Sequence, residues 1–177
     1  MTITPNPQHA ATAHALIREY GFLRLEHYMD NDADALETVN MPSGWEILGS
    51  GCYRMAFLAP DGLVYKVETD IADYDTSVER PNESEFANFI RNADKIKEMT
   101  NGRARFAECE YVDELNVIVM EYCNGNSGDV MRSAYSLSDK WEAILGRVLD
   151  EEIVTDLHHN NLILDENDVV VIFDYTH

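Results

Sequence analysis

The sequence predicts an α+β fold in which an antiparallel five-stranded lobe with one helix precedes a shorter, mainly helical lobe. Three observations support this class. Runs of β-prone residues alternate with turn residues over 44–68 and again over 106–123. Apolar residues recur at helical spacing over 82–93 and 138–150. Two apolar runs then flank a polar turn over 162–173, which predicts one more hairpin.

The first elements are two hairpins. Residues 44–57 are predicted to form a strand, a glycine-containing turn and a second strand. Because Gly49 and Gly51 have no Cβ, the backbone around Ser50 can close over phosphate groups and offer N–H donors. Asp61-Gly62 predicts a tight turn. An alternating strand follows over 63–68, with Lys66 in its middle.

A helix is predicted over 82–93, with Phe86, Phe89 and Ile90 on one face. Glu85 is the preferred carboxylate to pair with Lys66, and Glu83 is the alternative. A glutamate at a helix start also complements the helix dipole, so this position alone does not establish an ion pair.

Residues 106–112 and 115–123 predict another hairpin, turned at Asp113-Glu114. The helix predicted over 138–150 has Ser138 as its N-cap. Its apolar stripe consists of Trp141, Ile144, Leu145, Val148 and Leu149.

Asp156, Asn161 and Asp174 carry the strongest chemical signal. Phosphoryl transfer needs a carboxylate beside the acceptor hydroxyl, and amide and carboxylate oxygens that hold Mg²⁺ against ATP. The order acid, amide, strand, turn, strand, acid supplies this set. The alternative is an ordinary hairpin turn at 165–168, because Asp and Asn are common turn residues.

These elements, in this order, resemble the protein-kinase-like superfamily over residues 44–177. The resemblance implies that Lys66 binds the α- and β-phosphates of ATP, after a glycine loop formed by Gly49, Ser50 and Gly51. It also implies a hinge between two lobes after Met120, where backbone groups of Glu121 and Cys123 bind adenine.

By the same resemblance, Asp156 orients the acceptor hydroxyl, and Asn161 and Asp174 hold Mg²⁺. The chain departs from the usual pattern at several places. Arg54 replaces the third loop glycine, and Val154-Thr155 replaces the usual His-Arg. His158 stands where many protein kinases have Lys, as in small-molecule phosphotransferases, and no role is assigned to it.

The chain also resembles the early host-shutoff protein kinase of short-tailed coliphages. This resemblance implies a serine/threonine kinase acting on host proteins in the host cytoplasm. Three parts are expected: a helical extension over 1–40, a small lobe over 41–123 and a truncated large lobe over 124–177. Because the expected large lobe is short, the alternative is a catalytically weak binding module that inhibits a host protein.

Charge and composition limit the kinds of molecule that the chain is expected to bind. The chain has 33 acidic and 13 basic residues, a formal net charge of −20. Such a charge opposes binding to nucleic acid or an anionic membrane and favours partners with a basic surface. The three cysteines fit no zinc spacing and indicate reduced thiols in a cytoplasmic protein. No apolar run long enough to span a bilayer is found.

The first 40 residues form a separate segment. Residues 12–20 have a helical pattern, Gly21 is predicted to interrupt it, and 22–29 resume it. We expect this segment to pack on the small lobe, with a homodimer contact as the alternative. His9, His14 and His27 are expected at the surface.

Overall fold

The computed structural model describes residues 3–30, 41–50, 54–69, 80–126, 130–133, 136–154, 157–159 and 161–173, with side chains for all of these except 19–30 and Ser50. The chain forms two compact units. The first unit comprises Met1–Glu83 and Cys109–Tyr122, and the second comprises Ser84–Glu108 and Cys123–His177. The boundaries expected at 40/41 and 123/124 stay predictions, and these units differ from them by grouping 84–108 with the C-terminal part.

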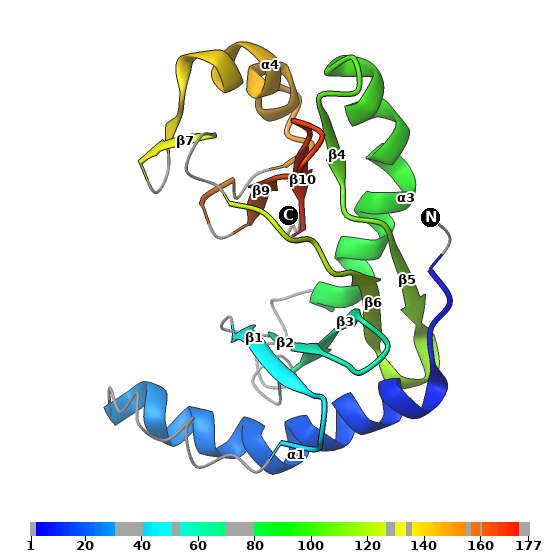
Figure 1. Cartoon of the computed structure of the whole chain (residues 1–177). Coiled ribbons are helices and arrows are strands. Elements are labelled where there is room, and N and C mark those ends of the chain that lie inside the picture. The colour runs from blue at the N-terminus through cyan, green and yellow to red at the C-terminus, as the bar shows by residue number, and fades with distance from the viewer. Residues whose placement is uncertain are drawn as a thin grey trace. The chain divides into compact units, whose positions relative to one another are not determined.

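The first unit is built on a five-stranded sheet in which every neighbouring pair is antiparallel (Figure 1). The strand order is β1-β2-β3-β6-β5. The predicted α+β class with a five-stranded antiparallel sheet is therefore confirmed. The strands are β1 (Glu46–Ser50), β2 (Arg54–Leu58), β3 (Leu63–Glu68), β5 (Cys109–Val112) and β6 (Val117–Glu121).

The helix α1 (Pro7–Asp30) packs on one face of this sheet. Asn6 caps the helix, because its Oδ1 accepts the Gln8 N–H at 3.0 Å, and Pro7 suits the first helical position. The expected packing of the N-terminal segment on the small lobe is confirmed for residues 3–18, whose side chains are described, and residues 31–40 lie outside the described residues. The prediction that Gly21 interrupts the helix is wrong, since one glycine costs a helix only about 1 kcal/mol. The core of this unit includes Ala10, Ala13, Leu16 and Ile17 of α1 and Met55, Phe57, Tyr65, Val67, Val117 and Val119 of the sheet.

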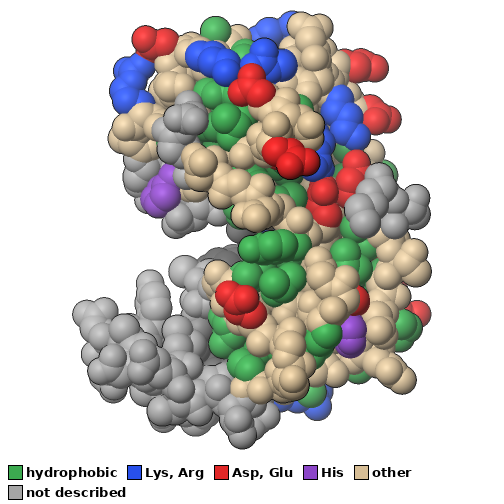
Figure 2. Space-filling view, in the orientation of Figure 1, with side chains coloured by type: hydrophobic (Ala, Val, Ile, Leu, Met, Phe, Trp, Pro, Cys, Tyr) green, Lys and Arg blue, Asp and Glu red, His purple; other side chains and the backbone are tan. Residues whose placement is uncertain are grey.

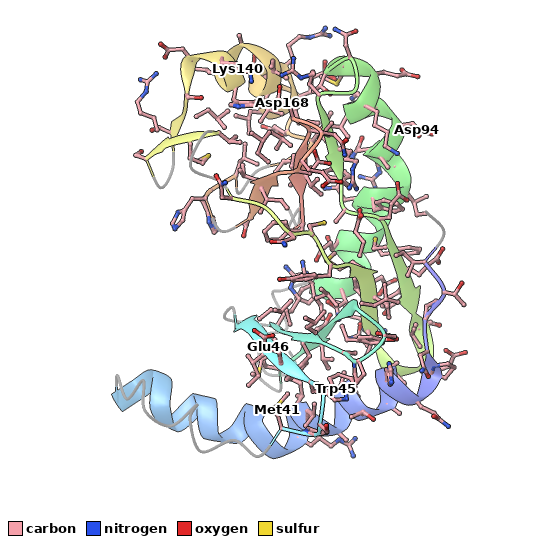
Figure 3. All side chains as sticks on the ribbon, viewed as in Figure 1. Met41, Trp45, Glu46, Asp94, Lys140 and Asp168 are labelled. Atoms are coloured by element: carbon pink, nitrogen blue, oxygen red, sulfur yellow. The ribbon has the colours of Figure 1, made fainter. Side chains whose placement is uncertain are left out.

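A polar network centred on Asp61 joins α1 to the β2–β3 turn. His9 Nδ1 lies 2.7 Å from Asp61 Oδ2, and the Tyr65 hydroxyl donates to the same oxygen at 2.8 Å. The Leu63 N–H donates to Asp61 Oδ1 at 3.1 Å. His9 and His14, expected at the surface, are partly exposed, and the side chain of His27 lies outside the described residues. Figure 3 labels Trp45, whose ring is 5.5 Å from that of His9.

Replacing Asp61 with Asn is expected to remove the part of the free energy of unfolding that depends on ionisation of the Asp61 carboxyl. Partial burial alone would raise the pKa of Asp61, but the hydrogen bonds from Tyr65, His9 and the Leu63 N–H lower it below 3.8. A lowered folded-state pKa means that the stabilisation is complete above the ordinary pKa and is lost as pH falls through the folded value. Thermal unfolding from about pH 6 to pH 2 measures the difference. The midpoint of Asp61→Asn lies below that of the wild type at pH 6, and the gap closes in acid; a constant gap would contradict this assignment.

Among the residues that the structure describes, the second unit contains two helices and five short strands. β10 (Val170–Ile172) lies between β4 (Ala104–Phe106), which runs parallel to it, and β9 (Leu162–Leu164), which runs antiparallel. The predicted hairpin over 162–173 is thus confirmed. The other elements are α3 (Pro81–Met99, which begins in the first unit), β7 (Met131–Ser133), β8 (Ser136–Leu137) and α4 (Asp139–Asp150). Among the described helices, none combines the length and apolar character needed to span a bilayer.

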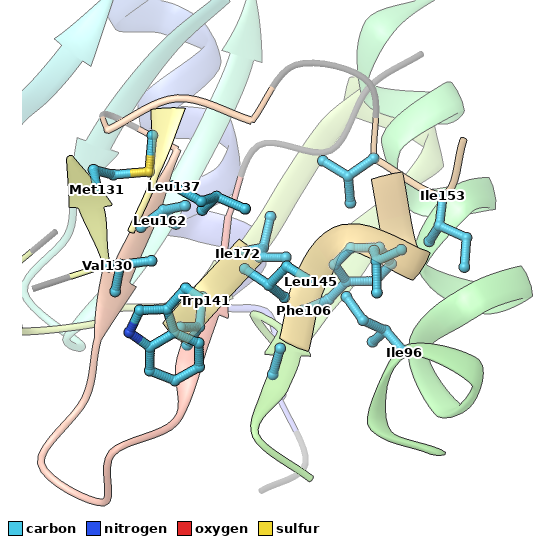
Figure 4. Packing of buried hydrophobic residues seen from close by; sticks show 14 residues of the cluster. Ile96, Phe106, Val130, Met131, Leu137, Trp141, Leu145, Ile153, Leu162 and Ile172 are labelled. Atoms are coloured by element: carbon cyan, nitrogen blue, oxygen red, sulfur yellow. The ribbon is translucent and has the colours of Figure 1, made fainter. Parts of the chain in front are cut away.

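One hydrophobic cluster fills the second unit (Figure 4). Trp141, Leu145 and Val148 of α4 are buried in it, and Ile144 and Leu149 pack against it, so the predicted apolar stripe is confirmed. Ser138 occupies the N-cap, as predicted, although its side chain makes no capping hydrogen bond. The other buried members of the cluster are Ile96, Ala104, Phe106, Val130, Met131, Leu137, Ile153, Val154, Leu162, Val170 and Ile172.

Residues 106–112 do not form the single strand that the sequence predicted. Phe106 ends β4 in the second unit, and Cys109 begins β5 in the first. Between them the Ala107 N–H donates to the Ile172 carbonyl at 2.8 Å. Phe106 joins the second core, so a strand-like pattern is divided between two sheets.

Helix α3 buries a largely polar stripe. Asn82, Glu85, Asn88 and Asn92 are all less than 9% exposed, and Ile96 is the apolar residue that continues this face. The predicted apolar face is only partly buried, because Ile90 is 68% exposed. Amides and a carboxylate can be buried only where hydrogen bonds replace those made to water, so this stripe marks a constrained region.

Candidate active site

Lys66 lies in the centre of β3. Its register partners are Ala56 on β2 and Ile118 on β6. Side chains alternate across a strand, so Lys66 points to the face opposite Tyr65 and Val67, which pack on the core shared with α1. Lys66 is only 7% exposed. A lysine this buried is rare and needs polar or charged partners.

The start of α3 is tied to the sheet beside Lys66. Asn82 Nδ2 donates to the Lys66 carbonyl at 3.1 Å and to the Asn116 carbonyl at 2.7 Å. The Asn82 N–H, one of the free donors of the first helical turn, donates to Glu68 Oε1 at 2.8 Å. These bonds all lie within the first unit and fix the backbone of Lys66 to the first residues of α3.

The two candidate glutamates differ in burial. The side chain of Glu83 is 62% exposed, and its Oε2 is 4.0 Å from Arg80 Nη1. Glu85 is fully buried. Lys66 and Glu85 belong to different compact units, and their pairing stays a prediction.

The glycine turn is described in part. Gly49 lies in β1 at a register shift between Ile47 and Gly49. A Cβ built on Gly49 would meet no atom of the described residues within 4 Å, so these residues leave the backbone open on that side. Gly51 and the side chain of Ser50 lie outside the described residues, and Arg54, at the place of the third glycine, begins β2.

The predicted hinge coincides with the passage from one unit to the other. Glu121 ends β6, and the boundary between the units falls between Tyr122 and Cys123. Beyond it, Leu164 donates its N–H to the Asn126 carbonyl at 2.8 Å, which adds this segment to the edge of β9. A Cβ on Gly125 would lie 2.4 Å from the Leu164 carbonyl oxygen, so only glycine fits here.

Gly125→Ala is therefore expected to destabilise the second unit by about 1–3 kcal/mol, because backbone must move to admit the methyl group. Gly49→Ala is the matched control, since its new Cβ enters open space. Denaturant unfolding of both variants measures the difference. Equal stabilities would show that the segment after the hinge does not pack on β9 as described.

The segment that leads to Asp156 is anchored by α4. That helix ends in a Schellman motif: the Ile153 N–H donates to the Val148 carbonyl at 3.1 Å, and the Glu152 N–H to the Leu149 carbonyl at 2.9 Å. Ile153 and Val154 are buried. Asp156 itself lies outside the described residues.

Asn161 is placed next to the strand that leads to Asp174. It is 7% exposed, and its N–H donates to the His158 carbonyl at 2.9 Å. The Phe173 N–H donates to the Asn161 carbonyl at 3.0 Å. Asp174 lies outside the described residues, but it is covalently joined to a residue that contacts Asn161. Among the described residues, no group of three or more His, Cys, Asp or Glu is placed to hold a metal ion.

The turn of the β9–β10 hairpin is fixed to α4 and to the residue before β4. Asp165 Oδ1 accepts the N–H groups of Asn167 and Val169 at 2.8 and 3.0 Å. Asp168, with φ of 59°, accepts from Arg103 at 2.8 Å and from Lys140 at 3.3 Å. Figure 3 labels Lys140 and Asp168, which lie close together.

The sequence reasoning missed two sets of residues: the Asp168 ion pairs and the buried amides of α3. The amides of Asn82, Asn88 and Asn92 did leave a signal, because together with Glu85 they recur at helical spacing. That spacing is also typical of a helix face exposed to solvent. Only the burial of the side chains in the tertiary structure distinguishes a buried polar face from an exposed one.

No known protein family and no curated protein matches the sequence. Solved structures with some similarity include an apo pseudokinase, at 13% identity and a TM-score of 0.38 over 74% of this chain and 56% of the pseudokinase chain. A second is the streptomycin–ATP complex of an aminoglycoside phosphotransferase, at 15% identity and a TM-score of 0.41 over 81% of this chain and 71% of the other. A MAP kinase from Leishmania major is 19% identical, with a TM-score of 0.29 over 92% of this chain and 50% of the kinase. This chain thus spans about half the length of the pseudokinase and of the MAP kinase.

Proposed function

We propose that this chain is an ATP-dependent phosphotransferase. One observation carries the proposal: two side chains of opposite charge, Lys66 and Glu85, are buried at the two positions predicted for the phosphate-binding lysine and its carboxylate partner. Burying a single charge costs several kcal/mol unless it is paired. Strongly buried ionisable groups are therefore candidates for a functional role.

In this proposal Lys66 binds the α- and β-phosphates of ATP, and Glu85 rather than the exposed Glu83 pairs with Lys66. The glycine turn of Gly49, Ser50 and Gly51 covers the phosphates with backbone N–H groups. Backbone groups of Glu121 and Cys123 bind the adenine ring. The order of β1, β2, β3, α3, β5 and β6 supports these assignments, because it presents the glycine turn, the lysine, the glutamate and the hinge in sequence.

Asn161 and Asp174 are proposed to hold Mg²⁺, since amide and carboxylate oxygens suit this hard cation. When bound there, the metal would neutralise phosphate charge. The Phe173–Asn161 hydrogen bond supports the pair, because it fixes the residue before Asp174 against Asn161. Asp156 accepts the proton of the acceptor hydroxyl, whose oxygen bonds to the γ-phosphorus as the bond between that phosphorus and the bridging oxygen breaks and ADP leaves.

For the substrate we propose Ser or Thr hydroxyls of host proteins, with the chain acting in the host cytoplasm as a phage kinase. This part of the proposal depends on the sequence resemblance alone. Fold and site geometry do not define a protein substrate.

Two measurements test the proposal. ATP with Mg²⁺ should raise the unfolding temperature of the wild type and leave that of Asp174→Ala unchanged. Radiolabelled γ-phosphate should be transferred to protein by the wild type and not by Asp156→Ala. Absence of any nucleotide-induced shift in the wild type would refute nucleotide binding.

The net charge of −20 favours a second candidate, an acidic module that binds and inhibits a host protein with a basic surface. Figure 2 shows that Lys and Arg side chains over the part that holds α4 are interspersed with carboxylates. Arg103, Lys140, Arg132 and Arg147 there are each within 4.0 Å of an acidic side chain. A salt-sensitive interaction that persists in Lys66→Met and Asp156→Ala, without phosphate transfer by the wild type, would favour this module.

A further inference from the structure

Two buried asparagines of α3 form a hydrogen-bonded ladder that ends on the backbone before Asp156. Asn92 Nδ2 donates to Asn88 Oδ1 at 2.6 Å, and Asn88 Nδ2 donates to the Ile153 carbonyl at 3.0 Å. Asn88 is 2% exposed and Asn92 is 8% exposed. All three residues belong to the second unit. Figure 4 shows Ile153 at the side of the core where α3 lies.

The chemistry of the amide explains why two asparagines are needed. An amide has one accepting oxygen and one donating nitrogen, and either can face a given partner. The Ile153 carbonyl requires a donor. Because Asn92 donates to the oxygen of Asn88, it turns the nitrogen of Asn88 toward Ile153. Asn88 thus holds the carbonyl, and Asn92 selects the orientation of Asn88.

The ladder completes the fixation of Ile153. The N–H of this residue is held by Val148 of α4, its carbonyl by Asn88 of α3, and its side chain is 2% exposed in the core. Asp156 follows three residues later. Asn161 is held further along the same segment, because its N–H donates to the His158 carbonyl and its carbonyl accepts the Phe173 N–H. Two helices therefore hold the two consecutive peptide groups that flank Ile153, at the start of the segment that leads to Asp156.

We propose that Asn88 and Asn92 are positioning residues for the loop that carries Asp156 and Asn161. The inference depends on the proposed phosphotransfer for its kinetic effect, but not for its effect on the loop. The role of the two asparagines is to fix the Ile153 carbonyl, three residues before Asp156, which carries the proposed reacting carboxylate.

Asn92→Asp is the sharpest test, because it replaces an amide with a carboxyl of the same shape. The ionised carboxylate cannot donate, so Asn88 turns its nitrogen toward it and presents its oxygen to the Ile153 carbonyl. We expect kcat for phosphotransfer to fall roughly tenfold to a hundredfold, with the KM for ATP unchanged. When protonated, the introduced carboxyl donates as the amide does, so the defect shrinks as pH falls from about 8 to 5. A purely structural role would produce neither the kcat effect in folded protein nor this pH profile.

Two comparisons make the test specific. Asp94→Asn is the matched control, since it makes the reverse exchange on the exposed side of α3, two residues away, and it should leave kcat unchanged. Asn88→Leu removes the donor itself, so adding Asn92→Asp to it should cause no further loss of kcat. If the losses of kcat in the two single variants add in the double variant, the two asparagines do not act through one hydrogen-bonded ladder. Where Asn92→Asp does not fold, Asn92→Ala takes its place in the kcat and hydrogen-exchange measurements, which need no titrating side chain.

Hydrogen exchange of the amides over 157–162 separates failure of this inference from failure of the proposed function. Exchange should be faster in Asn92→Asp than in the wild type or Asp94→Asn, whether or not phosphate is transferred. If the wild type transfers no phosphate, the proposed function fails and the exchange result alone decides the positioning role. Unchanged exchange would overturn it.

Discussion

Replacing Lys66 with Met is expected to lower phosphotransfer by about 10²-fold or more, because the proposed site loses the cation that stabilises the phosphates in the transition state. Met keeps the length of the aliphatic chain and can occupy a buried position of β3, where Lys66 is 7% exposed. The measurement is kcat/KM for γ-phosphate transfer, made where both proteins are folded. Lys95→Met is the matched control: Lys95 is 47% exposed on α3 and pairs with Glu151 at 2.8 Å, so activity should be retained.

The same variant tests the proposed pair by stability alone. If Lys66 and Glu85 are partners, Lys66→Met or Glu85→Gln leaves one buried charge without compensation and costs about 3–5 kcal/mol. The double variant removes both charges and should be less destabilised than the sum of the two single variants. Additive losses in denaturant unfolding would show that the two side chains have separate partners.

Replacing Trp141 with Ala is expected to destabilise the second unit by about 3–5 kcal/mol, since it deletes the largest fully buried side chain of that core. The effect has a second part. Arg103 Cζ and Lys140 Nζ lie 5.4 and 4.7 Å from the centre of the Trp141 ring, and both cations also bind Asp168. Loss of the ring therefore also loosens the turn of the β9–β10 hairpin.

Denaturant unfolding followed by circular dichroism measures the loss, and the fluorescence of Trp45 reports separately on the first unit. Trp141→Phe is the control that retains an aromatic ring and should lose less stability than Trp141→Ala. A cost below about 1 kcal/mol for Trp141→Ala would contradict the packing described for this core.

The local elements were largely predictable. Runs of β-prone residues located β2, β3 and β6, and the turn residues Asp61-Gly62 located the hairpin of β2 and β3. The apolar stripe of α4 was found residue by residue. These features depend on residues close in sequence, whose spacing determines which face of a strand or helix is apolar.

The candidate site was predictable only as a set of residue types. Sequence spacing selected Lys66, Glu85 and Asn161, and all three are buried. It could not distinguish Glu85 from Glu83, because two residues of the same charge in one helical turn differ only in what surrounds them. Gly51, Asp156 and Asp174 stay predictions, since they lie outside the described residues.

The sequence by itself determined the strands and their turns, the α4 stripe, and the order in which the polar site residues follow these elements. Only the tertiary structure decided that 106–112 divides between two sheets, that the amides of α3 are buried, and that Asp61 joins a turn to α1. The physical reason is the range of the interactions. Periodicity reports the free energy of burying apolar side chains within one element, whereas a buried amide or carboxylate is stable only beside partners far away in the chain.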